Sequence, residues 1–183
     1  CYSPTGQNRS RFARETSEIY GINVVDVNTP EEAVDGADIV LCATNARSTV
    51  FKPEWAKLGM HISCITQFEV PPETVKASDI AIVHTATAEP IFTTTHGLEH
   101  PEKTGKNQSF AKDAGTADLP TIGDLLAGNA KRRENDDQVT IYLNTVGIGL
   151  QFTAVAALLY KKAKEQGVGN TIPTEWLTQS EMS

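Results

Sequence analysis

The sequence predicts an α/β fold, a doubly wound parallel sheet, from three observations. Short apolar runs of strand length recur along the chain, and they are rich in β-branched residues. Helical patterns separate these runs at spacings of roughly 15 to 25 residues, as is typical of helical crossovers between parallel strands. The run at residues 39–43 is unbroken, as expected for a strand covered on both faces of such a sheet.

The chain begins with a predicted helix and strand. Asn8 or Ser10 can cap a helix that ends at Gly21, since glycine readily takes the left-handed conformation found after helices. Residues 22–27 form a short β-branched run, which predicts a strand. The chain opens as if already inside a strand, so we expect it to be the latter part of a longer polypeptide.

A second helix signal precedes the strand at residues 39–43. Thr29 suits the N-cap, Pro30 suits the first helical position, and Gly36 can end the helix. A capped helix, a tight turn and a buried strand together describe one crossover unit of a parallel sheet.

The remaining elements follow the same signals. Further strands are expected at residues 61–66, 79–84 and 139–143, and further helices at residues 50–57, 71–75, 120–128 and 144–166. Residues 85–118 lack periodicity and are longer than an ordinary connection, which leaves a functional lid or a flexible insertion as alternatives.

Composition excludes several classes of function. The net charge of −7 argues against non-specific nucleic-acid binding, which depends on clustered positive charge. No apolar run is long enough to span a bilayer. Cys42 and Cys64 fall inside predicted strands, where cysteine is typically a small buried hydrophobe, so the chain is expected to be cytoplasmic.

Two predicted strand ends carry small polar residues. Thr44 and Asn45 follow one strand, and residues 144–147 follow another. Ligands of open α/β sheets bind beyond the carboxyl ends of the strands, and free amides at a helix start favour anions. These turns therefore predict a nucleotide site; the alternative is that Thr44 and Asn144 only cap helices.

A third polar group lies near the start of the chain. At this point of a dinucleotide site an acid normally binds the ribose 2′-hydroxyl, but no acid occurs here before Glu15. Ser3, Thr5 and Arg9 instead suit a 2′-phosphate, because arginine can bind phosphate with two hydrogen bonds. This pattern favours NADP over NAD; the alternative is a turn followed by an N-cap.

Candidate proton donors lie beyond two other strands. His84 can face the cleft or only cap the sheet, and Glu69 lies where a general acid would be useful, although a surface loop is the commoner place for such a residue. His96 and His100 have no clearly placed third ligand, so no metal site is predicted.

Several pieces of the sequence, in order and spacing, resemble the ornithine cyclodeaminase/mu-crystallin family. These pieces are YSPT with FA, EAVDGADIV, ATN, GMHI, IGDLLAG and residues 139–150. The resemblance implies a Rossmann-like fold and an NAD(P)-dependent enzyme or binder acting on amino acids, keto acids or cyclic imines. It also implies a homodimer, with a substrate and dimerisation domain built largely from upstream sequence.

The resemblance assigns the expected domains, and the polar turns described above assign the expected cofactor contacts. Residues 1–145 would form an incomplete NAD(P)-binding domain that lacks its first βα unit, and residues 146–183 a helix and arm that pack toward the upstream domain. The expected cofactor contacts are Ser3, Thr5, Arg9, Ala43, Thr44, Asn45, Thr145, Val146 and Gly147.

Two departures from the family pattern shape the functional expectation. The glycine-rich pyrophosphate loop and the substrate-binding lysine and arginine would lie upstream of Cys1. Where family members carry an acid/base aspartate, this chain has Phe68 at or next to that position, followed by Glu69. A reductase of cyclic imines or of 2-keto or imino acids, with Glu69 and His84 as catalytic candidates, fits better than ornithine cyclisation. The alternatives are a non-catalytic NADP-binding protein, a cyclodeaminase-type lyase, and a fragment without activity of its own.

Overall fold

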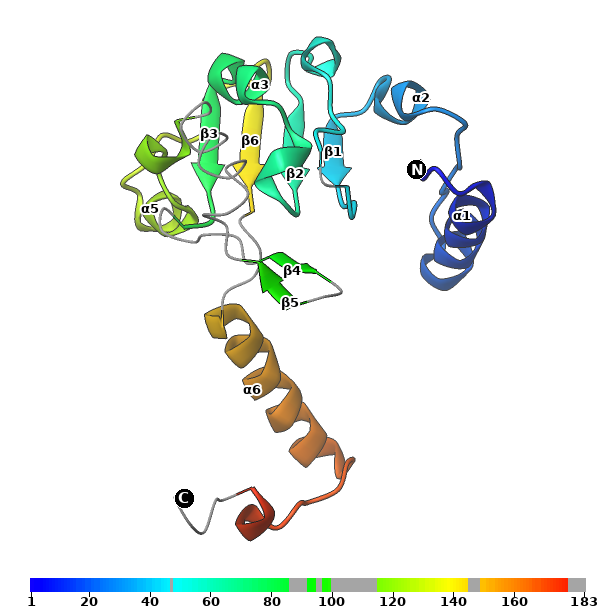
Figure 1. The fold of residues 1–183 in the computed structure, drawn as a ribbon, viewed down its shortest axis with the longest axis vertical. Coiled ribbons are helices and arrows are strands. Elements are labelled where there is room, and N and C mark those ends of the chain that lie inside the picture. Colours follow the sequence, from blue (N-terminus) through cyan, green and yellow to red (C-terminus); the bar gives the residue numbers. More distant parts are fainter. Residues whose placement is uncertain (47, 86–91, 95–96, 100–114, 145–148, 178–183) are drawn as a thin grey trace. The chain divides into compact units, whose positions relative to one another are not determined.

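The computed structural model describes residues 1–46, 48–85, 92–94, 97–99, 115–144 and 149–177 (Figure 1). The chain divides into two compact units, Cys1–Val146 and Gly147–Ser183. Each unit is considered by itself.

The first unit is built on a four-stranded parallel sheet. Its strands are β1 (Ile39–Cys42), β2 (His61–Cys64), β6 (Thr140–Leu143) and β3 (Ile80–Val83), in the spatial order β1-β2-β6-β3 (Figure 1). The register aligns the carboxyl ends of all four strands, since Cys42 pairs with Cys64, Cys64 with Leu143, and Val83 with Leu143. The predicted parallel α/β fold is confirmed, and its carboxyl edge gathers the residues that follow each strand.

Helices connect these strands. The first unit contains α1 (Gly6–Tyr20), α2 (Pro30–Val34), α3 (Pro72–Ala77) and α5 (Ile122–Ala127), together with short 3₁₀ turns at Pro53–Trp55 (η1), Gln67–Glu69 (η2) and Thr116–Asp118 (η4). Thr29 caps α2 as predicted, because its hydroxyl accepts a hydrogen bond from the Glu32 amide at 3.2 Å. Gly21 ends α1 with a φ of 66°, also as predicted.

The beginning of α1 and the strand after it differ from the prediction. The helix begins at Gly6 with Thr5 as its N-cap, earlier than Asn8 or Ser10. Residues 22–27 form no regular strand. These residues make one parallel pairing with the chain start. The Cys1 amino group donates to the Val25 carbonyl at 2.6 Å, and the Val27 amide donates to the Cys1 carbonyl at 3.1 Å. A single pairing is too short to be a ladder, which explains the difference.

One face of the sheet carries the core. The inward side chains of β2 and β6 are almost completely buried, with Ile62 and Leu143 at 0% exposure. Phe51 packs against them and meets Trp55 edge to face, with ring centroids 5.6 Å apart. Cys42 and Cys64 lie in this core as free thiols, as expected.

The other face of β1 is open in the part of the chain that the structure describes. Ile39 and Leu41 are 70% and 65% exposed. The expectation that this strand is covered on both faces is therefore wrong for the described residues, because only Cys42 and Val40 face the core.

Residues 85–118 are described only in part. Phe92–Thr94 (β4) and Gly97–Glu99 (β5) form a short antiparallel hairpin. The histidines considered for a metal site, His96 and His100, lie outside the described residues, and no cluster of metal-binding side chains occurs among those that are described. Whether this segment is a lid or an insertion stays a prediction.

The second unit contains α6 (Gly149–Gln166) and a 3₁₀ turn at Thr174–Trp176 (η5). Gly167 ends α6 with a φ of 65°, which agrees with the predicted stop. Within the described residues, no helix is both long and apolar enough to cross a membrane.

Candidate functional site

The candidate site lies at the carboxyl edge of the sheet, where polar residues follow β1 and β2. Thr44 comes two residues after β1, and η2 carries Glu69 shortly after β2. One carboxylate oxygen of Glu69 accepts hydrogen bonds from both the amide and the hydroxyl of Thr44, at 2.7 and 2.6 Å. The two turns are therefore joined by a direct side-chain contact.

The Glu69 carboxylate is fully buried and fully engaged. Its side chain has 0% exposure, and its second oxygen accepts from the amides of Ile65 and Thr66, each at 3.0 Å. The backbone carbonyl of Glu69 also accepts from the amides of Val50 and Phe51, at 3.0 and 2.9 Å. Four donors surround the two carboxylate oxygens, and this arrangement favours a role in holding the two turns over a role as a proton donor.

The turn after β1 leaves other groups open to a ligand. The Thr44 hydroxyl donates to Glu69 and accepts from the Ala46 amide at 3.2 Å, so its hydrogen-bonding capacity is largely used within the protein. Ala43 and Asn45, on either side of Thr44, are exposed. This turn can therefore offer a ligand its backbone groups and the Asn45 amide.

A second pair of polar residues follows β3 and β6, the other two strands of this edge. The His84 amide donates to the Leu143 carbonyl at 2.9 Å, which places His84 beside the residue that precedes Asn144. The His84 side chain is 7% exposed, and its Nδ1 atom finds no hydrogen-bond partner among the described residues; the same holds for the buried Oδ1 atom of Asn144. Because an unpaired buried polar atom is costly, each of these two atoms suits a polar partner from a bound molecule.

The three cofactor contacts expected just after Asn144 are not described. Thr145, Val146 and Gly147 lie outside the described residues, so their assignment stays a prediction.

The polar group near the chain start is drawn together at the beginning of α1. The Arg9 guanidinium folds back over Gly6, whose β-carbon position would lie 3.7 Å from its central carbon. Thr5 is the N-cap of α1, but its side chain makes no capping hydrogen bond, and the first turn contains no acidic residue. The group therefore places a cation, a hydroxyl and free helix amides side by side.

Arg9 also has protein partners that the sequence reasoning missed. Its Nη1 atom donates to the Ser3 carbonyl at 3.2 Å, and its Nη2 atom donates to the Asn28 side chain at 2.8 Å. Asp26 lies 3.9 Å from its Nε atom and accepts from the Ser10 hydroxyl at 2.5 Å. The parallel pairing of residues 22–27 with the chain start brings Asp26 beside Arg9, and no sequence signal next to Arg9 indicates it.

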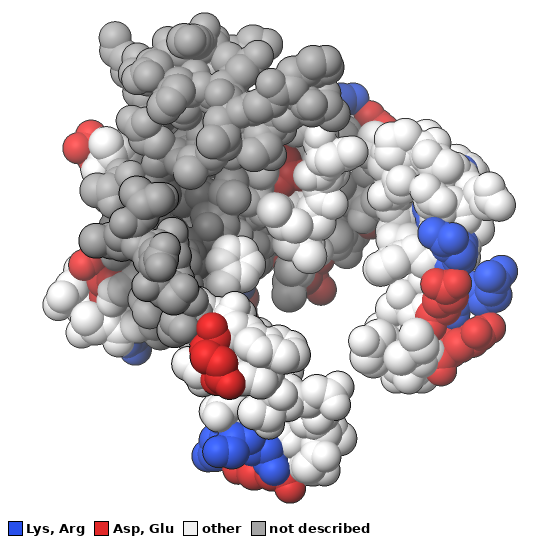
Figure 2. Space-filling model, turned by 60° about the horizontal axis from the view of Figure 1, so that its bottom comes forward, with Lys and Arg blue, Asp and Glu red and all other residues white. Residues whose placement is uncertain are grey.

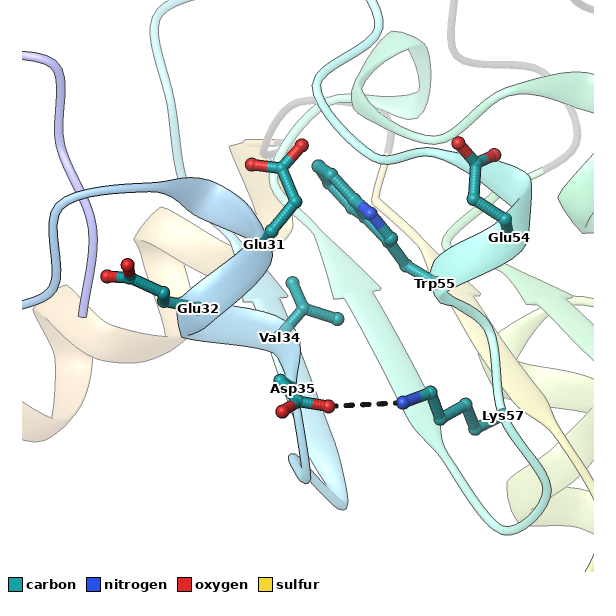
Figure 3. Close-up of a pocket in the computed structure, with 7 residues that line it drawn as sticks. All are labelled: Glu31, Glu32, Val34, Asp35, Glu54, Trp55 and Lys57. Carbon is teal, nitrogen blue, oxygen red and sulfur yellow. Dashed lines mark hydrogen bonds and ion pairs between the residues drawn. The ribbon is translucent and has the colours of Figure 1, made fainter.

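A separate pocket lies away from these residues, between α2 and the segment that leads into β2. It is a cavity of about 350 Å³ lined by Glu31, Glu32, Val34, Asp35, Glu54, Trp55 and Lys57 (Figure 3). Lys57 reaches Asp35 across it, at 3.2 Å, and Lys52 pairs with Glu31 at 2.6 Å. The hydrogen bond from Lys52 lowers the pKa of Glu31. The carboxylates that line this pocket would repel the phosphates of a dinucleotide.

Charge is mixed on the described part of one face of the molecule. On the face shown in Figure 2, blue Lys and Arg atoms lie next to red Asp and Glu atoms.

Burial raises the pKa of the Cys42 thiol to about 11 and that of Cys64 to about 12, so neither cysteine supplies a thiolate near the carboxyl edge of the sheet at neutral pH.

Comparison with known proteins identifies a family over most of the chain. The sequence model of the ornithine cyclodeaminase/mu-crystallin family matches residues 1–167. The Delta(1)-pyrroline-2-carboxylate reductase of Bacillus cereus is 32% identical over 176 residues, which make up 93% of this chain and 51% of that protein.

Two solved structures are similar in fold. The Delta(1)-pyrroline-2-carboxylate reductase of Thermococcus litoralis, in complex with NADH and L-proline, shares 28% identity with a TM-score of 0.71, over 92% of this chain and 50% of that one. An archaeal alanine dehydrogenase dimer with bound NAD shares 25% identity with a TM-score of 0.63, over 91% and 50%. The chain thus spans about half the length of the relatives it matches.

Proposed function

Because this chain belongs to the ornithine cyclodeaminase/mu-crystallin family, we propose that the complete polypeptide is an NAD(P)-dependent oxidoreductase that reduces a cyclic imine or a 2-keto or imino acid. The observation that carries the proposal is the polar edge of the sheet, where Glu69 fixes Thr44 and where His84 and Asn144 keep unpaired buried atoms. Relatives that match nearly the whole chain are reductases of such a cyclic imine.

The residues of this edge fit a nicotinamide cofactor. Ala43 and Asn45 present exposed groups beyond β1, and the unpaired atoms of His84 and Asn144 suit a polar group such as a carboxamide. When bound, the cofactor supplies the hydride; the protein supplies orientation and a proton. Thr145, Val146 and Gly147 are proposed as further cofactor contacts.

His84 is the proposed proton donor. Its Nδ1 atom is buried at the carboxyl edge and uses no hydrogen bond within the described protein. The other catalytic candidate, Glu69, accepts two hydrogen bonds on each carboxylate oxygen, so its accepting capacity is already used within the protein. The His84 imidazole is therefore better placed than Glu69 to donate a proton to the substrate nitrogen or oxygen atom that is bonded to the carbon being reduced.

NADP is the proposed preferred cofactor. Ser3, Thr5 and Arg9 gather at the start of α1, where the free helix amides and the guanidinium favour an anion, against the opposing charge of the Asp26 carboxylate 3.9 Å from the Arg9 Nε atom. Each terminal nitrogen of Arg9 carries two N–H groups, and the described protein contacts use one of each. The two solved relatives described above contain NADH and NAD, and titration of this protein with NADPH and NADH tests the preference.

The complete protein is proposed to be a cytoplasmic homodimer in which α6 packs toward the upstream substrate domain. Apolar side chains one and two turns apart on α6 are exposed within its own unit, with Phe152 at 69%, Val155 at 58% and Leu159 at 61%. Exposed apolar rows of this kind usually meet another surface.

The test of the proposal uses the complete polypeptide. NADPH and NADH oxidation is followed by absorbance with a panel of cyclic imines and 2-keto acids, the latter with and without ammonia. Turnover of at least one of them is expected, and His84→Gln should lower kcat strongly. Absence of turnover with every substrate would contradict the proposal.

A non-catalytic NADP-binding protein is the second candidate. It is favoured by Phe68 at or next to the position of the family's acid/base aspartate and by the buried, engaged state of Glu69. Tight NADPH binding without turnover, and unchanged by His84→Ala, is the result that distinguishes it. Release of ammonia from ornithine without net reduction of NAD(P) would instead identify a lyase.

A further inference from the structure

Glu69 stands at the centre of a hydrogen-bond cluster that ties three segments together. Its side chain bonds the turn after β1 through Thr44 and the turn after β2 through Ile65 and Thr66. Its backbone carbonyl bonds the amides of residues 50 and 51, which precede η1. All of these segments flank the carboxyl edge at which the cofactor is proposed to bind.

The chemistry of the cluster requires a carboxylate. All four groups that face the two oxygens are donors: three backbone amides and one hydroxyl. Glutamine would offer one accepting oxygen and one NH₂ group, so that either the Thr44 pair or the amides of Ile65 and Thr66 would face a donor. Aspartate would be too short by one methylene to reach both turns.

The cluster fixes the groups that remain available to a cofactor. Since the Thr44 hydroxyl and amide both point to Glu69, the backbone of the turn is set in one conformation, and Ala43 and Asn45 are the exposed residues on either side. Preorganised turns bind more tightly because less conformational entropy is lost on binding.

We propose that Glu69 is a positioning residue that holds the Thr44 turn in the conformation that binds the nicotinamide cofactor, and that it takes no part in proton transfer. The inference rests on the proposed function, because it assigns a role within that cofactor site. It gives Glu69 a different role from His84, the other catalytic candidate.

The test compares cofactor binding and pH profiles in the complete polypeptide. Glu69→Gln should raise the Kd for both NADH and NADPH by about tenfold or more, as expected for the loss of hydrogen bonds to a charged group. The shape of the pH profile of kcat should stay the same, since no titrating catalytic group has been removed. Thr44→Val should weaken cofactor binding because it removes the hydroxyl that bonds Glu69, and Thr44→Ser, which keeps the hydroxyl, should bind nearly as well as the wild type. The double variant Glu69→Gln/Thr44→Val should have a Kd little higher than that of Glu69→Gln alone.

The chain contains a matched control. The Asp124 carboxylate accepts from the amide and the hydroxyl of Thr121, at 2.8 and 2.7 Å, which reproduces the Glu69–Thr44 contact in the capping box of α5. Asp124→Asn therefore makes the same kind of chemical change, with an expected change in cofactor Kd of less than about twofold.

The outcomes separate the two proposals. If the wild-type protein binds neither NADH nor NADPH, the proposed function is overturned, and this inference with it. If the wild type binds and Glu69→Gln binds equally well, or if Glu69→Gln alters the pH profile of kcat with an unchanged Kd, only the positioning role is overturned. Should Glu69→Gln fail to fold, the comparison of Thr44→Val with Thr44→Ser decides the question, because equal binding by these two variants would contradict it.

Discussion

Gly59 is a position at which a single added methyl group should disturb the approach to β2. It lies two residues before β2 with a φ of +81°, and an added β-carbon would come within 2.5 Å of the Asp136 carbonyl oxygen. The neighbouring backbone is tied down: the Gly59 amide donates to the Asp137 carbonyl at 2.8 Å, and Arg133 donates to the Gly59 carbonyl.

The cost of Gly59→Ala follows from these contacts. A left-handed conformation costs a non-glycine residue about 1 to 2 kcal/mol, partly offset by about 0.4 to 1 kcal/mol from the reduced entropy of the unfolded chain. Relief of the close contact requires the backbone at Asp136 to move, which weakens hydrogen bonds worth about 1 kcal/mol each. We expect a total loss of about 3 kcal/mol of unfolding free energy.

Gly128→Ala is the matched control for this prediction. Gly128 has a similar φ of +79°, but nothing lies within 4 Å of its β-carbon position. Its substitution should therefore cost about 1 kcal/mol or less, from the backbone conformation alone. Urea titrations of the two variants of the complete polypeptide, followed by tryptophan fluorescence, measure the difference. Equal losses for the two would refute the steric argument.

Three further predictions concern the sheet. Burial, and to a smaller extent Arg133, lowers the pKa of His61 below 6.5, so the native state resists protonation of this side chain. The urea midpoint should therefore fall as the pH decreases through about 6.5. His61→Gln should reduce this fall, and an unchanged pH dependence in the variant would contradict the assignment. Cys42 and Cys64, with pKa values of about 11 and 12, should resist iodoacetamide at pH 8 until urea unfolds the protein, as peptide mass spectrometry would show; rapid native labelling would be inconsistent with their burial. Leu143→Ala should lower the unfolding free energy by about 2 to 5 kcal/mol, because Leu143 is completely buried between neighbouring strands; a loss below about 1 kcal/mol in a urea titration would contradict this packing.

The fold was predictable because its signals are local. Apolar runs, the Thr29 and Pro30 start and the Gly21, Gly128 and Gly167 stops each depend on a few adjacent residues. The strand order, and the single pairing of residues 22–27 with the chain start, depend on contacts between residues distant in sequence. No local pattern encodes such contacts.

The candidate site was predictable as a location but not as a set of roles. The position of Thr44 beyond a buried strand placed it at the carboxyl edge. Its bond to Glu69 spans 25 residues and arises because the turns after β1 and β2 lie side by side in the sheet. Likewise, the approach of Asp26 to Arg9 follows from chain pairing and not from the residues next to Arg9.

The central claim is that a nicotinamide cofactor binds at the carboxyl edge of this sheet. Hydrogen exchange of the complete polypeptide, with and without saturating NADPH or NADH, tests it most directly. We predict slower exchange at residues 43–46 and at the amides that follow Asn144, with little change in the acidic pocket formed by α2 and residues 54–57. Protection confined to that pocket, or no protection in either place, would contradict the claim.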